Sequence, residues 1–195
     1  MDSIPFAFCD AVVGTIKDLP RVDVPFRNAK WNKALQDHSA NRQCFQLFVV
    51  FYDDKWTYSL FNTKFGSNTP FATLLERVGP KYLRIGSIEV AVALALIETS
   101  KEEIHVLIKS MKPFFNFPRL HLLDMHSKIP ENDLDQLLSL FAKINISEFY
   151  SCCNGRSAIK YAKQLMQQDT LVKEISFSLS SAAHAQELAT AIADY

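Results

Sequence analysis

The side chains best suited to covalent chemistry are two adjacent cysteines and one histidine that follow two predicted strands. Cys152 and Cys153 come after a strand expected at residues 146–151, and His126 comes after a strand expected at residues 119–125. In open α/β sheets the carboxyl ends of neighbouring strands form the edge where ligands bind. A helix starting just after the cysteines would direct its N–H groups at Cys153 and favour the reactive thiolate. This pattern is compatible with a small thiol-dependent hydrolase or transferase.

The same residues can also be interpreted as structural instead of catalytic. Cysteine is among the residue types that are most often buried and inert, which favours a structural role for Cys152 and Cys153. His121 and His126 are further potential metal ligands, but positions five apart on a strand point to opposite faces, so no metal site is predicted. The five glycines are isolated and form no phosphate-binding loop. The sequence therefore predicts no cofactor.

The composition is that of one ordinary globular chain. Of its 195 residues 48% are hydrophobic, and 21 Lys and Arg balance 21 Asp and Glu. This excludes a disordered protein, which combines low hydrophobicity with high net charge. A net charge of zero, without basic runs, also argues against nucleic-acid binding.

The expected compartment is the cytoplasm or the nucleus. The first twenty residues lack the basic region of a secretory signal. The longest apolar run, residues 90–97, is about half as long as a membrane-spanning helix, so no membrane partner is predicted. Four irregularly spaced cysteines do not suit a disulfide framework, and we expect free thiols.

The N-terminal part of the chain predicts two helices. Apolar residues at helical spacing indicate a helix over residues 4–19, which Pro20 ends. A second, shorter helix is expected around Phe26, Trp31 and Leu35, because residues four to five apart place one side on the core.

A β-hairpin is expected next. Residues 44–52 and 56–62 are rich in β-branched and aromatic residues and flank a turn that contains Asp53 and Asp54. Residues 69–78 then predict a short helix that Gly79 and Pro80 close, followed by a strand at residues 82–85.

From residue 89 onward strand-like and helix-like segments alternate. Strands are expected at residues 90–97, 119–125, 146–151 and 173–178, and helices at residues 101–111, 131–143, 156–168 and 182–194. The strand centres stand about 27 residues apart, which indicates an internal repeat of βα units. Because parallel strands need long crossovers and the helices supply that length, we expect a parallel sheet.

Three of these units carry a spaced apolar motif. Phe117-x-x-Leu120-x-Leu122 and Val172-x-x-Ile175-x-Phe177 match L-x-x-L-x-L, and residues 146–151 match its spacing with Ser151 in the last position. The units therefore resemble a degenerate leucine-rich repeat, with a plain open α/β sheet as the alternative. Such repeats place Asn or Cys after the strand to satisfy the turn backbone. The predicted fold class is α/β: N-terminal helices and a β-hairpin, then about four βα units in a parallel, leucine-rich-repeat-like sheet.

The N-terminus resembles a degenerate F-box. The motif's layout is matched by Ile4-Pro5 opening a helix, then Leu19-Pro20, then Trp31-Asn32-Lys33-Ala34-Leu35. With the hairpin and its Asp53-Asp54-Lys55-Trp56-x-Tyr58 turn, the chain is similar to the F-box-associated proteins that nematodes have expanded. The resemblance divides the chain into an F-box-like helical segment, residues 1–42, and a hairpin plus βα-repeat part, residues 43–195, within one continuous globular unit.

This resemblance implies a substrate-receptor role in ubiquitin transfer. The N-terminal helices would dock on the linker subunit of a cullin-type ubiquitin ligase, and the βα units would present a surface to a target protein. The docking face would consist of Ile4, Pro5, Phe8, Val12 and Trp31. A non-enzymatic protein–protein interaction module is therefore the leading hypothesis, with the thiol enzyme using Cys152 or Cys153 and His126 as the alternative. Self-association through the last strand or the final helix stays open.

Overall fold

The structure is a computed structural model, and it describes residues 4–16, 19, 26–52, 55–67, 69–90, 97–123, 129–152, 155–168, 172–178, 186 and 189–190. Its helices are α1 (Phe6–Thr15), α2 (Ala29–Asn41), α3 (Phe71–Val78), α4 (Lys101–Met111), α5 (Glu131–Phe141) and α6 (Arg156–Gln167), with a 3₁₀ turn η1 (Lys112–Phe114). Its strands are β1 (Gln43–Tyr52), β2 (Lys55–Phe61), β3 (Leu83–Val90), β4 (Ile97–Thr99), β5 (Phe115–Leu122), β6 (Glu148–Ser151) and β7 (Glu174–Phe177).

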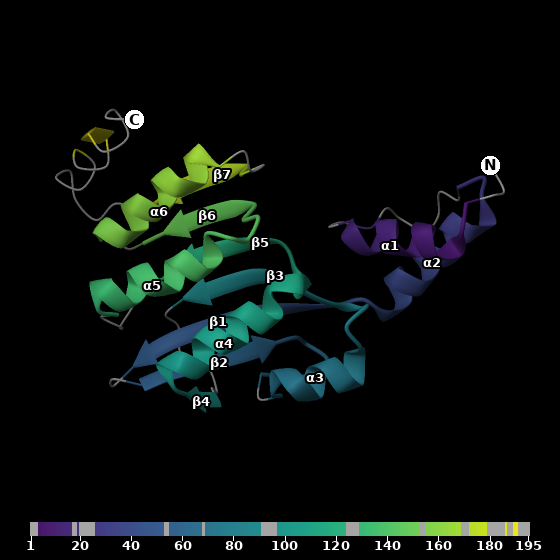
Figure 1. Cartoon of the computed structure of the whole chain (residues 1–195), viewed down its shortest axis with the longest axis horizontal. Helices are drawn as coiled ribbons and strands as arrows, with labels where there is room; N and C mark the ends of the chain where they lie inside the picture. The colour runs from purple at the N-terminus through teal and green to yellow at the C-terminus, as the bar shows by residue number, and fades with distance from the viewer. Residues whose placement is uncertain are drawn as a thin grey trace.

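The strands form one sheet in the order β4-β2-β1-β3-β5-β6-β7 (Figure 1). This confirms the α/β class, with N-terminal helices and a hairpin ahead of alternating strands and helices. The sheet is mixed rather than parallel throughout. β1, β3, β5, β6 and β7 run parallel, whereas β2 and β4 at one end pair antiparallel.

The first βα unit differs from the prediction. Its parallel strand is β3, which ends at Val90, where the predicted strand of residues 90–97 begins. Residues 91–96 lie outside the described residues, and Ile97 opens β4, which pairs antiparallel with β2. An apolar run fits a buried strand or its flanks equally well, so its composition did not fix the strand's limits. The final predicted helix, residues 182–194, lies mostly outside the described residues.

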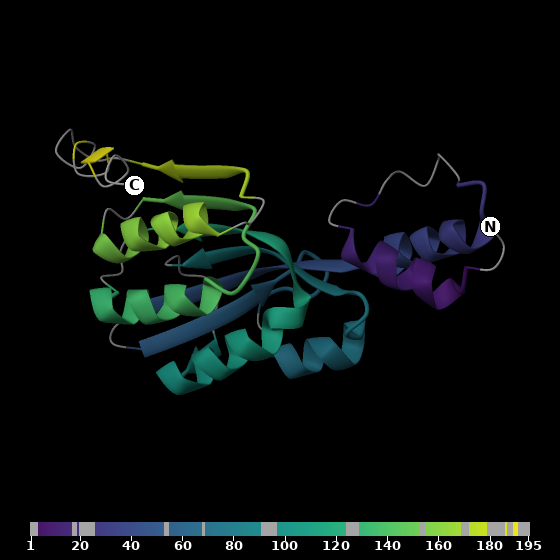
Figure 2. The same cartoon turned by 45° about the horizontal axis from the view of Figure 1, so that its top comes forward.

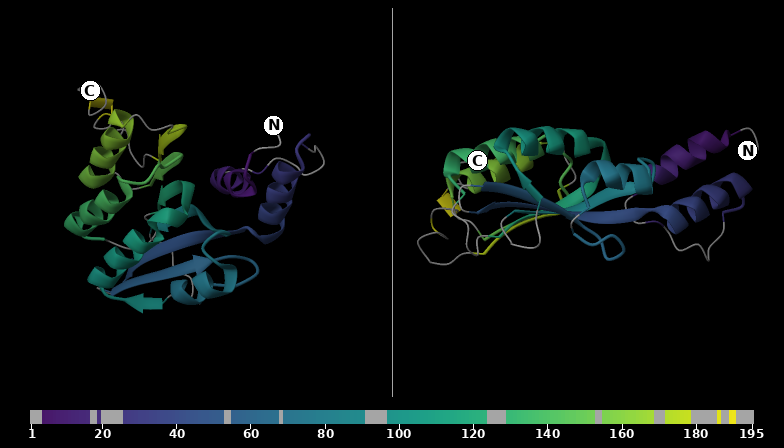
Figure 3. Two further views of the ribbon diagram at one scale, coloured as in Figure 1. Left: turned by 45° about the vertical axis from the view of Figure 1, so that its right-hand side comes forward. Right: turned by 90° about the horizontal axis from the view of Figure 1, so that it is seen from below.

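The core lies between the sheet and the helices α3–α6, which all pack on one face (Figures 2 and 3). Alternate strand residues point into it, including Leu47, Ile88 and Leu120, all of which are fully buried. Helix α5 contributes Leu137 and Phe141, which are fully buried as well. The opposite face of the sheet is therefore lined by the other half of the strand residues.

Polar contacts cap the start of α4 and link α5 to α6. Ser100 and Glu103 form a reciprocal capping box at the start of α4, as Ser-x-x-Glu spacing predicts. At the start of α6 the Ser157 backbone N–H donates to the Glu131 carboxylate of α5 at 2.5 Å. A Cβ atom at Gly155 would lie 2.8 Å from that carboxylate, so glycine leaves room for the Glu131 carboxylate at the start of α6.

Helices α1 and α2, here called the helical pair, stand at one end of the molecule (Figure 1). They close a second, smaller hydrophobic cluster made of Cys9, Val13, Ala34 and Leu35. α2 leads into β1 through Arg42, whose guanidinium donates to the carbonyls of Val13 and Ile16 at the end of α1. α1 ends at Thr15, four residues before Leu19, where the sequence predicts the end, because Ile16 is already extended with a φ of −68° and a ψ of 124°.

Candidate functional site

The sheet face opposite α3–α6 carries a row of polar side chains. The register places His121 of β5, Tyr150 of β6 and Ser176 of β7 side by side, and Glu89 of β3 continues the row. A parallel row contains Ser87, Arg119, Glu148 and Glu174. We call this surface the polar face; it comprises Gln46, Ser87, Glu89, Arg119, His121, Glu148, Tyr150, Glu174 and Ser176.

Side chains on the polar face contact one another across the strands. The Arg119 guanidinium lies 2.9 Å from the Glu148 carboxylate, and the rings of His121 and Tyr150 meet edge to face at 5.8 Å between centroids. Gln46 donates a hydrogen bond to Glu89. These contacts link the side chains of neighbouring strands across the face.

A hollow of about 430 Å³ opens on this face towards the amino ends of the strands. Its walls include Gln46, Asn62, Ser87, Asn116 and Arg119. It lies at a β-bulge, because Phe45 pairs with Ile85 while the next residue, Gln46, pairs with Ser87, which leaves Gly86 unmatched. Bulges redirect strand side chains next to functional surfaces, and this one shapes a recess that amide, hydroxyl and guanidinium groups line.

The cysteine of the thiol hypothesis that the structure describes is Cys152. It follows β6 and its thiol donates to the Tyr150 hydroxyl at 3.2 Å, and this contact raises the pKa of Tyr150. Cys152 therefore borders the polar face. Cys153 and His126 lie outside the described residues, so the pairing of a cysteine with His126 stays a prediction. Among the described residues no group of three or more His, Cys, Asp and Glu is arranged to hold a metal ion.

The predicted docking residues of the helical pair divide into two groups. Phe8 is 55% exposed and Pro5 is also exposed, whereas Ile4, Val12 and Trp31 are half-buried, with Ile4 and Trp31 packed on the small cluster. Phe8 meets the Trp31 ring edge to face at 6.2 Å. Phe26, 49% exposed, lies at the same distance from Trp31. Phe8, Trp31 and Phe26 therefore form an exposed aromatic patch.

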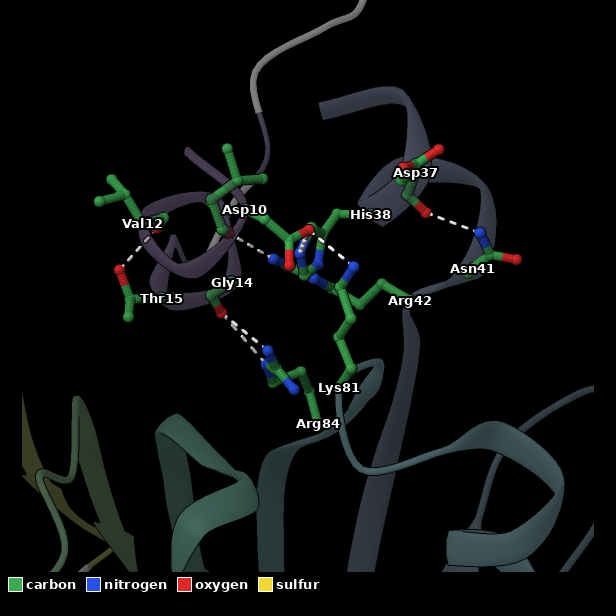
Figure 4. A network of polar contacts seen from close by, with 11 residues as sticks. Asp10, Val12, Gly14, Thr15, Asp37, His38, Asn41, Arg42, Lys81 and Arg84 are labelled. Atoms are coloured by element: carbon green, nitrogen blue, oxygen red, sulfur yellow. Dashed lines mark hydrogen bonds and ion pairs between the residues drawn. The ribbon is translucent and has the colours of Figure 1, made fainter. Parts of the chain in front are cut away.

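Polar side chains connect the helical pair to the sheet (Figure 4). This junction consists of Asp10 on α1, His38 on α2, Arg42, Lys81 and Arg84. Lys81 lies 2.7 Å from the Asp10 carboxylate, and Arg84 on β3 donates to the Gly14 carbonyl at 2.9 Å. The two hydrophobic clusters are thus joined by ionic and hydrogen-bonded contacts.

The junction contains a buried histidine, His38. His38 is 1% exposed, and among the described residues neither of its ring nitrogens has a hydrogen-bond partner, although Nε2 lies 3.3 Å from Asp10. Burial lowers the pKa of His38, Arg42 lowers it further, and Asp10 raises it in part. The hydrogen bond to Asp10 raises the pKa of Lys81, which holds its positive charge.

Most residues of the polar face were not predicted as functional residues, although the sequence contains a signal for them. In the three apolar motifs, the residue between the last two apolar positions is His121, Tyr150 or Ser176. Side chains alternate along a strand, so this middle position must point away from the core. The junction had no comparable signal, because Asp10, His38 and Lys81 are far apart in the sequence.

The chain was compared with protein-family models, with curated proteins and with solved structures, and none of the three comparisons found a match. Within the part of the chain that the structure describes, no helix has the length and apolar character needed to cross a membrane.

Proposed function

We propose that the protein is a non-enzymatic interaction module that binds a target protein on its polar face. The observation that carries this proposal is the one-sided helix layer: α3–α6 cover one face, and polar side chains of β3, β5, β6 and β7, with Gln46 of β1, line the other. Stacked repeat units bind partners on such extended surfaces. Tyrosine and arginine, which Tyr150 and Arg119 supply here, are enriched in protein interfaces.

In the same proposal the helical pair supplies a second contact. The aromatic patch of Phe8, Phe26 and Trp31 would dock on the linker subunit of a cullin-type ubiquitin ligase, which makes the protein a substrate receptor. Support comes from two large aromatic side chains that are about half exposed beside a third. Aromatic residues of this kind provide most of the binding energy in many interfaces.

Target binding is tested by changing the polar face and comparing it with a matched change on the helix layer. The test variant combines Tyr150→Ala with Glu174→Lys. The control combines Val106→Ala with Glu102→Lys, two exposed positions on α4. Proteins captured from a lysate by the wild type and the control, and identified by mass spectrometry, should be lost with the test variant. Equal capture by both variants would contradict binding on the polar face.

Linker binding is tested with the purified linker subunit and isothermal titration calorimetry. Phe8→Asp places a charge in the aromatic patch and should abolish binding, while Val106→Asp at an exposed position on α4 should leave it unchanged. Circular dichroism shows whether each variant is folded. Absence of binding by the wild type would remove the ligase role and leave the target-binding proposal to stand on the polar face alone.

A further inference from the structure

A cavity of about 640 Å³ lies between the helical pair and the sheet. It is formed where the second half of α1 faces the start of β3 and the turn from η1 into β5. Its position between two hydrophobic clusters matches the usual place of small-molecule sites, which favour boundaries between packed units. The volume is also within the range of such sites.

One wall of the cavity is cationic. Lys81, Arg84 and Asp10 line it together. Lys81 pairs with Asp10, so this wall carries a net charge of one positive unit, which Arg84 supplies. The buried ring of His38 belongs to the same wall; its Nε2 lies 3.3 Å from Asp10, and its Nδ1 has no hydrogen-bond partner among the described residues. A buried polar group without a partner costs free energy that a bound ligand would recover.

The other wall is aromatic and contains a strained residue. Phe114, Phe115 and Phe117 line it, and Phe117 is 37% exposed. Phe117 has a φ of +46°, a conformation that bulky side chains rarely adopt. Backbone strain of this kind concentrates at binding sites, where it holds a side chain in place for a ligand.

We propose that this cavity binds a small aromatic acid, a planar ring that carries one carboxylate or phosphate group. The anionic group pairs with Lys81 and Arg84 and accepts a hydrogen bond from the His38 ring, while the aromatic body lies against Phe117. The site is distinct from the polar face and from the aromatic patch, and it does not depend on the proposed function.

Isothermal titration of the full chain with phenyl phosphate and with phenylacetate tests the proposal and separates the two anions. Inorganic phosphate carries the charge without the ring, and benzyl alcohol carries the ring without the charge. At least one aromatic acid should bind about tenfold more tightly than either partial probe, because each wall contributes on the order of 1.4 kcal/mol. Equal binding of phenyl phosphate and inorganic phosphate, or no saturable binding of either acid below about 10 mM, would overturn the proposal.

Two lysines provide a matched pair of variants. Lys81→Gln removes a cavity cation that is 41% exposed and pairs with one carboxylate, and should weaken binding about tenfold. Lys55→Gln removes an exposed lysine that pairs with Glu98 outside the cavity, and should leave binding unchanged. An equal loss in both variants would indicate nonspecific charge attraction and would contradict the site.

A variant of the aromatic wall tests the site without removing the ion pair between Lys81 and Asp10. Phe117→Leu retains an apolar side chain but removes the ring, and should weaken the aromatic acids severalfold while leaving inorganic phosphate unaffected. Thermal melting by circular dichroism shows that each variant is folded. Unchanged affinity for the aromatic acids in folded Phe117→Leu would refute the assigned position of the ring.

Discussion

The helical pair and the sheet bury their apolar residues in different ways. The sheet core is continuous from β2 to α6, and the side chains of Leu74, Leu137 and Phe149 in it are fully buried. The helical pair closes around four buried residues and meets the sheet through the charged junction. The free energy gained by burying apolar side chains is roughly proportional to the buried area. The contribution of ion pairs falls as the salt concentration rises, and it changes when one partner gains or loses a proton. The two regions should therefore respond differently to the same kind of change.

Two matched leucines give the largest expected effect. Leu137→Ala in the sheet core should lower the free energy of unfolding by about 2–5 kcal/mol, because it leaves a cavity among fully buried neighbours. Leu35→Ala removes the same group from the small cluster, and its effect should be confined to the helical pair.

The chain contains one tryptophan in each region, which allows the two effects to be measured separately. Trp31 packs on the small cluster and Trp56 lies in the sheet core. Urea unfolding of Trp56→Phe follows Trp31, and that of Trp31→Phe follows Trp56. Leu35→Ala should shift the Trp31 transition and leave that of Trp56 nearly unchanged. Equal shifts of both probes would show that the two clusters unfold as one unit.

A smaller effect is expected where α5 and α6 meet in the sheet region. In Gly155→Ala the new Cβ would displace the Glu131 carboxylate, which would lose its hydrogen bond to the Ser157 N–H. The loss of such a helix cap costs about 1 kcal/mol. The Trp56 transition in urea should report this change. In the background of Glu131→Ala the same glycine substitution should be nearly neutral, and a full effect there would contradict the assigned contact.

How far the sequence predicted these features depends on the range of the interactions. Helix α4 was predicted with its observed limits, because Ser100 and Glu103 mark its start and the apolar spacing continues to Met111. The alternation of apolar and polar residues around Tyr150 is the sequence signal for the polar face, and it could be read from the sequence because strand periodicity is local. The bulge at Gly86 and the contact of His38 with Asp10 depend on tertiary packing, and local patterns do not specify it.

Acid should destabilise the helical pair. Burial lowers the pKa of His38 below that of an unfolded histidine, so the unfolded chain binds more protons and stability falls as pH decreases below about 6.5. Protonation would also place a positive charge beside Arg42, Lys81 and Arg84, with Asp10 as the facing anion.

The pH effect is measured by the Trp31 transition at about pH 7.5 and about pH 5.5, and the Trp56 transition is followed under the same conditions. His105 on α4 also has a pKa lowered by burial and by Lys101, so the Trp56 transition should shift in the same direction. His38→Gln should flatten the pH dependence of Trp31 and leave that of Trp56 unaltered. A Trp31 transition that keeps its pH dependence in this variant would exclude His38 as its origin.

The smallest effect is expected from a comparison of two buried polar side chains, His38 in the junction and Tyr161 in the sheet core. Like His38, the hydroxyl of Tyr161 on α6 is buried and has no hydrogen-bond partner among the described residues, and burial raises its pKa. Tyr161 belongs to an apolar core, where its ring packs edge to face on Phe149 at 5.3 Å between centroids. Tyr161→Phe keeps that packing and removes the unpaired hydroxyl, so it should be neutral or raise the free energy of unfolding by up to about 1 kcal/mol. A loss of more than about 1 kcal/mol in the Trp56 transition would mean that the hydroxyl is hydrogen-bonded in the folded protein, and that the sheet core, like the junction, contains a polar contact that its stability requires.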